Sequence, residues 1–141
     1  MSTSLDAARA ELGSRCDVIE DCYEFMLAYA AQGLASDVGS GSGAQVRERL
    51  RKSDAALSDL AAFLGRFVEQ LGIEDPAPYT GFIAVLDRDA RDAQAAIRLV
   101  LAQPAISSQL VDNLNASIHL RALLTDLFLI DEVLKTHGRL G

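Results

Sequence analysis

The chain has 141 residues, a length typical of one domain, and half of them are apolar, which favours a packed core over disorder. Twenty acidic residues outnumber 13 basic ones. The net charge of −7 argues against binding to nucleic acid phosphates or to an anionic membrane surface. Residues 1–6 show no basic region leading into an apolar run, and no segment has the roughly 18 uninterrupted apolar residues of a spanning helix, so we expect a cytoplasmic protein.

Glycine and proline divide the sequence into four segments. Four of the ten glycines lie within 33–43, a Gly/Ser-rich stretch of the kind that forms flexible connections. Pro76 and Pro78 interrupt the chain next, and Pro104 interrupts it again, because proline lacks the backbone donor that a helix interior uses. We therefore predict a single domain, 1–141, of four helices. Their expected ranges are about 4–34, 45–71, 79–103 and 106–137, with a flexible linker at 35–44.

Each segment has a helical period. In the second, alternating steps of four and three residues connect Val46, Leu50, Ser53, Leu57, Leu60, Leu64, Phe67 and Leu71. Such a stripe lies on one side of a helix and forms the seam along which antiparallel helices pack. The sequence thus predicts an all-α protein, an antiparallel up-down-up-down four-helix bundle of long helices.

The only cysteines, Cys16 and Cys22, fall on the first predicted helix. Six residues of helix separate their Cα atoms by about 9 Å, which exceeds the roughly 7 Å that a disulfide spans. We interpret both as buried thiols that pack as small apolar residues. A redox or metal role for Cys22 is the alternative.

Acidic residues form a negative band on the first helix, made of Asp17, Glu20, Asp21 and Glu24. A di-iron bundle needs such carboxylates inside the bundle and a Glu-x-x-His motif on other helices. Neither histidine of this chain has a Glu three residues before it, so no metal site is expected. The sequence also lacks a phosphate-binding glycine loop and a G-x-S-x-G motif, so we predict no catalytic residue, no cofactor and no enzyme.

His119 supports the alternative function. Phosphorelay bundles use an exposed histidine, but Arg121 lies two residues further on, about 200° around the helix, and cannot assist the same phosphoryl group. A haem held between Met26 and His119 is a further possibility, although the chain lacks the Cys-x-x-Cys-His motif of covalent attachment. The alternative is therefore a haem-type cofactor-binding or phosphorelay signalling bundle that uses His119.

The last predicted helix has more apolar residues than one buried stripe requires. Its core face comprises Leu120, Leu123, Leu127, Ile130 and Leu134, and a second apolar face lies opposite. The first helix likewise has a second stripe, and the first and last helices of an up-down bundle are neighbours. We predict an interface on these two helices. Its residues are Val18, Cys22, Phe25, Tyr29, Val111, Ile118, Ala122, Leu129 and Val133.

We therefore expect a non-enzymatic helical interaction protein, which is an adaptor, chaperone or regulatory subunit. It would bind a protein partner or, as a homodimer, a second copy of itself through this apolar surface. The acidic band would steer basic partners toward the surface. Neither nucleic acid nor a membrane is an expected partner.

Overall fold

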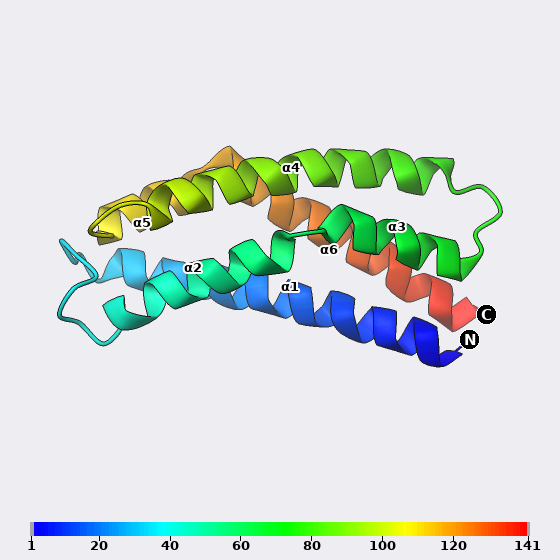
Figure 1. Ribbon diagram of the computed structural model, residues 1–141, viewed down its shortest axis with the longest axis horizontal. Helices are drawn as coiled ribbons and strands as arrows, with labels where there is room; N and C mark the ends of the chain where they lie inside the picture. Colours follow the sequence, from blue (N-terminus) through cyan, green and yellow to red (C-terminus); the bar gives the residue numbers. More distant parts are fainter. Residues whose placement is uncertain (1, 141) are drawn as a thin grey trace.

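Within residues 2–140, the part of the chain that the computed structural model describes, there are six helices and no strand (Figure 1). Their bounds are α1 Ser2–Ala31, α2 Gly43–Leu57, α3 Leu60–Leu71, α4 Ala77–Leu101, α5 Ser108–Ala116 and α6 Ile118–Leu140. The predicted all-α class is confirmed. The prediction of four uninterrupted helices is wrong in two places, because the second and fourth predicted ranges each contain two helices.

The helices lie along one long axis, and the chain runs back and forth beside itself (Figure 1). α2 and α3 return along α1, α4 runs parallel to α1, and α5 and α6 lead back toward the end where α1 begins. α1 packs chiefly against α2 and α5, whereas α4 packs against α6, α2 and α3. α1 and α6 therefore lie beside each other with less intimate packing than α1 and α2.

The second predicted helix breaks at Ser58 and Asp59. Ser58 is extended, with φ −67° and ψ 132°, and Asp59 has a left-handed backbone with φ 59°. Aspartate visits this region more readily than most residues. Arg15 of α1 donates hydrogen bonds to the carbonyl oxygens of Ala56 at 3.0 Å and of Ser58 at 2.8 Å. An arginine from the neighbouring helix thus satisfies carbonyls that the break leaves unpaired, which apolar periodicity cannot reveal.

The fourth predicted helix breaks at Ser117, which is extended with φ −64° and ψ 138°. A serine stands directly before each of the two resulting helices, α5 and α6, and caps its first turn. The side chain of Ser107 accepts from the N–H of Leu110 at 3.0 Å, and that of Ser117 accepts from the N–H of Leu120 at 3.4 Å. Each serine satisfies a backbone donor that the first turn of a helix leaves free. The helical phase therefore restarts at Ile118.

The segment between α1 and α2 is fastened to the segment between α4 and α5. One carboxylate oxygen of Asp37 accepts from the N–H of Ile106 at 2.7 Å, and the other accepts from Nε of Arg47 at 2.8 Å. The N–H of Ile106, and with it the Arg47 guanidinium, holds the pKa of Asp37 below its ordinary value. The Tyr29 hydroxyl also donates to the carbonyl oxygen of Ile106, at 2.7 Å. The linker expected to be flexible is thus anchored at Asp37.

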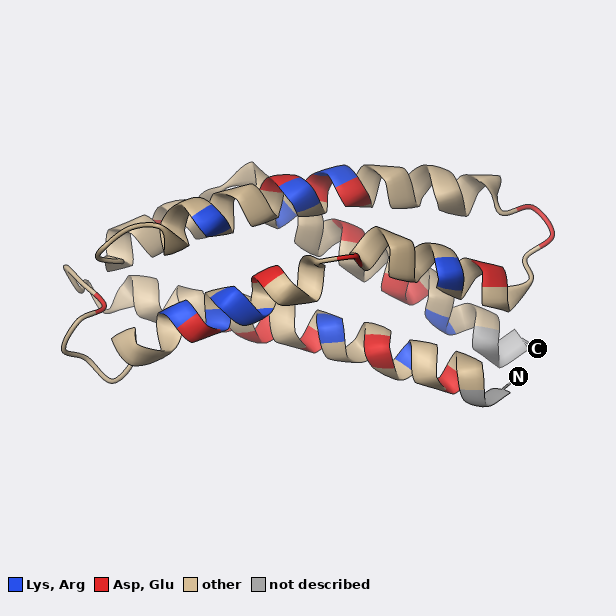
Figure 2. Ribbon diagram, in the orientation of Figure 1, with Lys and Arg blue, Asp and Glu red and all other residues tan. Residues whose placement is uncertain are grey.

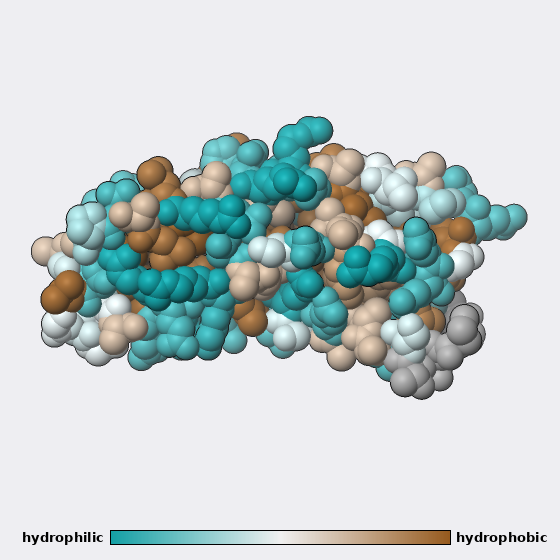
Figure 3. Space-filling view, viewed as in Figure 1, coloured by the Kyte–Doolittle hydropathy of each residue, from teal (hydrophilic) through white to brown (hydrophobic). Residues whose placement is uncertain are grey.

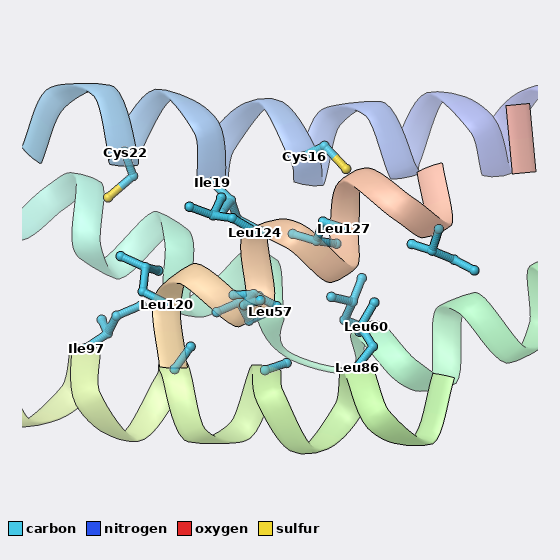
Figure 4. Packing of buried hydrophobic residues seen from close by; sticks show 14 of the residues in the cluster. Cys16, Ile19, Cys22, Leu57, Leu60, Leu86, Ile97, Leu120, Leu124 and Leu127 are labelled. Carbon is cyan, nitrogen blue, oxygen red and sulfur yellow. The ribbon is translucent and has the colours of Figure 1, made fainter. Parts of the chain in front are cut away.

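Aliphatic side chains fill the space between the helices (Figure 4). Cys16, Ile19 and Cys22 lie on the side of α1 that faces the other helices. The core face predicted for the last helix is buried throughout, at Leu120, Leu123, Leu127, Ile130 and Leu134. No helix in the described part of the chain combines the length and apolar character needed to cross a membrane.

Candidate interaction surface

α1 carries an acidic band that lacks compensating charge. Asp17, Asp21 and Glu24 are exposed, and Glu20 is half-buried. Burial, followed by the charges of Asp17 and other nearby carboxylates, raises the pKa of Glu20. Among the described residues, none of these four carboxylates takes part in an ion pair. Figure 2 shows the acidic positions of α1 in red, and this helix presents negative charge to its surroundings.

On one side, α1 packs against a basic helix. α2 has four basic residues and two acidic ones, and its basic positions form the blue stretch in Figure 2. The guanidinium carbon of Arg49 lies 4.6 Å from the centroid of the Phe25 ring on α1. Arg15 also pairs with Glu11 at 2.8 Å while it reaches the end of α2. Cation–π contact and hydrogen bonds therefore join the two helices, beside a hollow of about 320 Å³ that Asp21 of α1 and Arg49 of α2 line.

On the other side, the surface between α1 and α6 is hollowed. Two hollows of about 340 and 410 Å³ adjoin at Glu20, which lines both. Together they follow α1 from Arg9 to Glu24 and α6 from Arg121 to Lys135. Fifteen residues of helix correspond to about 22 Å. We call this open trough the α1–α6 furrow.

The α1–α6 furrow has an apolar floor beside its acidic edge. Phe128 of α6 is 54% exposed, and it lines the trough together with Tyr23 and Leu124. Leu129, 53% exposed, follows Phe128 on the outer side of α6. Glu24 and Arg121 line the rim. The furrow therefore offers a large aromatic side chain, with apolar neighbours, between charged edges.

The face formed by α2, α3 and α4 differs from the furrow. Hydrophilic side chains cover most of it, and apolar ones show between α2 and α4 (Figure 3). Asp54 of α2 accepts from Arg98 of α4 at 3.1 Å and from the side-chain amide of Gln94 at 3.0 Å. Polar contacts thus join the two helices across this face.

The described structure buries three of the nine residues predicted for an outer surface. Cys22, Tyr29 and Val111 are 3%, 0% and 0% exposed, so their predicted exposure is wrong. Two predicted residues are exposed, namely Ile118 at 74% and Leu129 at 53%. Four more are half-buried, namely Val18, Phe25, Ala122 and Val133. The structure thus brings only part of the predicted set to the surface.

Two physical causes explain these errors. Val111 precedes the break at Ser117, so its orientation cannot be extrapolated from the period of α6. α1 has α2 on one side and α5 on another, so it buries a wider strip than one stripe. Phe25 and Tyr29 stack with ring centroids 6.1 Å apart, and Phe25 lies under Arg49 of α2. The second apolar stripe of α1 therefore faces α2 rather than solvent.

Sequence reasoning missed Phe128 as a surface residue. The available signal is its spacing, because Phe128 lies four residues after Leu124 and seven after Arg121. Residues three, four and seven apart share one side of a helix, so these three residues mark a strip next to the core face. That strip is the α6 wall of the furrow.

Both cysteines are free, as their spacing predicts, and both are buried. Burial, and after it the charge of Asp131, raises the pKa of the Cys16 thiol to about 12. Burial also raises the pKa of Cys22. The thiolate is the nucleophilic and metal-binding form of cysteine, so both side chains are held in their unreactive form.

His119 lies on the outside of α6. Its side chain is 51% exposed, and its Nδ1 is 4.0 Å from a carboxylate oxygen of Asp92 on α4. Met26, by contrast, is 1% exposed inside the core. The two side chains therefore occupy different environments and do not line one common pocket. Among the described residues, no three His, Cys, Asp or Glu side chains are grouped as metal ligands.

A carboxyl pair lies between α4 and α6. Burial, followed by a hydrogen bond with Asp89, raises the pKa of Asp126 to about 7. One oxygen of Asp126 is buried, and it has no other hydrogen-bond partner within the described structure. The pair therefore retains a proton close to neutral pH, because two adjacent carboxylates repel each other.

Comparison of this chain with protein-family models, with curated proteins and with solved structures finds no match. Its function must therefore be inferred from its own residues.

Proposed function

We propose that this chain is a non-enzymatic helical interaction protein, an adaptor, chaperone or regulatory subunit, that binds another protein chain through α1 and α6. The observation that supports the proposal is the half-exposed Phe128 above the apolar floor of the α1–α6 furrow. Burying a side chain of this size contributes about 1.5–3 kcal/mol. Aromatic residues, phenylalanine among them, are enriched in protein–protein interfaces relative to the rest of the surface.

We infer that the six helices are an up-down-up-down bundle whose second and fourth members are interrupted. The direction of the chain is maintained from α2 into α3 and from α5 into α6, which supports this topology (Figure 1). In such a bundle the first and last members are neighbours. The furrow lies between α1 and α6, which pack less intimately than α1 and α2.

The protonated thiols support a non-enzymatic role. Cys16 and Cys22 are the strongest nucleophiles that the chain contains, and burial raises the pKa of each. Covalent catalysis by cysteine instead requires a depressed pKa or an adjacent base.

A second candidate function is a phosphorelay signalling bundle that uses His119. The half-exposed imidazole and the carboxylate of Asp92 beside it favour this candidate. Incubation with acetyl phosphate, followed by mass spectrometry, tests it. An acid-labile phosphoryl group that is lost in His119→Gln supports the second candidate. A Soret absorbance band in the purified protein would instead support the haem-type alternative.

The test of the proposed function compares the wild type, Phe128→Asp and Leu99→Asp as baits in extracts of the native host. Leu99 on α4 is 66% exposed, and it does not line the furrow, so it is the matched control. We expect a partner that is retained by the wild type and by Leu99→Asp and lost by Phe128→Asp, then reconstituted from purified components. If Phe128→Asp retains every partner of the wild type, the proposal is wrong.

A further inference from the structure

The α1–α6 furrow has the dimensions of a helix-binding groove. It follows two antiparallel helices for about 22 Å, the length of a helix of about 15 residues, or four turns. Helix-in-groove recognition places apolar side chains, at spacings of three, four and seven residues, into such a trough. Tyr23, Leu124 and Phe128 supply the apolar surface that receives them.

The charged side chains at the furrow determine which kind of helix fits. Lys135 pairs with Asp131 at 3.4 Å, so these two charges compensate each other. Arg9 donates to the carbonyl oxygen of Leu134 at 2.8 Å, and its guanidinium lies over the ring of Phe67. Both cations at this end are therefore occupied by contacts within the chain.

The remaining charges are asymmetric across the trough. The α1 rim carries Asp17, Glu20 and Glu24, none of which is in an ion pair within the described residues. The α6 rim carries Arg121. A bound cation next to Glu20 would offset the repulsion that this carboxylate receives from its acidic neighbours.

We infer, resting on the proposed function, that the occupant of the α1–α6 furrow is a basic amphipathic helix. Its apolar stripe contacts Leu124 and Phe128, and its lysine or arginine flank lies along the acidic rim of α1. The flank that faces Arg121 is neutral or acidic. Charge complementarity fixes this orientation and increases the association rate.

A second copy of this chain fits the furrow poorly. Its basic helix is α2, where Arg47 is held by Asp37 at 2.8 Å and Arg49 is stacked on Phe25. Arg47 and Arg49 of a second copy are therefore already engaged within that copy. Each copy also has a net charge of −7, so association of two copies through this acidic surface is opposed by repulsion.

The test uses two labelled 15-residue peptides of leucine and lysine with identical composition. One has leucines at spacings of three and four residues, and the other has the same residues in an order without an apolar stripe. Fluorescence anisotropy at two salt concentrations measures their affinity for the full chain. We expect the amphipathic peptide to bind at least about tenfold more tightly, with an affinity that falls as salt increases.

Variants of the chain test whether the amphipathic peptide binds in the furrow. We expect Phe128→Asp, and separately Glu20→Gln combined with Glu24→Gln, to weaken binding about fivefold or more. Leu99→Asp and Glu69→Gln, which change an apolar and an acidic side chain away from the furrow, should bind like the wild type. Circular dichroism checks that every variant keeps its helicity.

The outcomes separate this inference from the proposed function. Equal affinity for the two peptides, or equal affinity of the Glu20 and Glu24 double variant and the wild type, overturns the inference. Light scattering that shows a wild-type dimer, with its mass halved by Phe128→Asp, also overturns it, because the occupant is then a second copy. In either case, a reconstituted partner that depends on Phe128 leaves the proposed function standing.

Discussion

Two of the helices that neighbour α1, namely α2 and α6, differ in the charge that they place beside it. α2 is basic, and it places Arg49 on the ring of Phe25 while Arg15 of α1 reaches the carbonyls at the α2 end. α6 lies beside the acidic band of α1 at Glu20, and Asp131 of α6 adds to the charges that raise the pKa of this carboxyl. Both seams are hollowed, by about 320 Å³ on the α2 side and by about 340 and 410 Å³ on the α6 side, but the basic side chains of α2 line only the first.

The comparison shows that one amphipathic helix can pack against neighbours of different charge on its two sides. Apolar periodicity requires burial on both sides of α1, but it does not determine the charge of each neighbouring helix. Dehydrating the unpaired carboxylates on the α6 side without a cation would be costly. The acidic side of α1 is therefore the one that we propose for partner binding.

The largest effect on the free energy of unfolding is expected for core variants, which test whether packing differs between the α2 and the α6 sides of α1. Leu50 of α2 is 0% exposed and Leu124 of α6 is 8% exposed at the furrow. We expect Leu50→Ala to reduce the free energy of unfolding by about 3–5 kcal/mol, because the cavity cannot collapse. Leu124→Ala should cost about 2 kcal/mol, because water reaches the site. Urea unfolding measures both, and equal losses would contradict the difference between the seams.

Asp37 tests the anchoring of α2 at its beginning. Its pKa is lowered in the folded state, so its contribution to stability is present above its ordinary pKa of 3.8 and is lost as pH falls through the folded value. We expect Asp37→Asn to cost about 1.5–3 kcal/mol at pH 7. The two proteins should unfold at similar urea concentrations near pH 2. A difference that does not depend on pH would contradict this assignment.

Asp126 provides the opposite pH dependence, on the α6 side of the molecule. Its folded pKa of about 7 exceeds the ordinary value of 3.8, so stability is greatest at low pH and falls as pH rises through about 7. We expect Asp126→Asn to stabilise the protein at pH 8 by about 1–2 kcal/mol, a figure reduced for partial exposure. Asp112→Asn, at an exposed position of α5, is the control. Thermal melts from pH 4 to pH 8 measure the melting temperature of each protein. If the carboxyl pair holds no proton, the melting temperatures of the wild type and Asp126→Asn would change with pH in the same way.

The smallest effect on stability is expected at Leu129, on the outer side of α6. Leu129 is 53% exposed, so Leu129→Asp should change the free energy of unfolding by no more than about 0.5 kcal/mol. Its effect should appear in partner binding, because Leu129 adjoins Phe128 at the edge of the trough. A large loss of stability in this variant would show that Leu129 belongs to the core.

Apolar periodicity predicted the helical class and most of the core. The steps of three and four residues correctly placed Leu60 inside α3 and Leu127 inside α6. Periodicity failed where polar side chains act on the backbone. Beside the left-handed Asp59, the carbonyl oxygen of Ser58 accepts from Arg15 of another helix, and Ser117 caps the helix that follows the second break. Such contacts decide where a helix ends without disturbing the spacing of leucines on either side.

The linker and the surface were harder to predict because both depend on contacts between residues that are far apart in the sequence. The sequence places Gly43 in a stretch predicted to be flexible, yet Gly43 begins α2. A Cβ at this position would collide with the carbonyl oxygen of Asp37. The acidic band was visible in the sequence, but its position beside Phe128 is a long-range relation between α1 and α6. Spacing along one helix cannot show which residue of another helix lies opposite.

The hydrogen bonds that join Tyr29, Asp37 and Ile106 lie at the end of the molecule opposite to the start of α1 and the end of α6 (Figure 1). Tension applied at the two ends of the chain would therefore act across the α1–α6 furrow and peel the helices apart turn by turn. Rows of contacts that open one after another yield at lower force than rows loaded all at once. A polypeptide fused to either end would pull on the furrow before it pulled on the anchored loops, so the furrow would respond first to mechanical load.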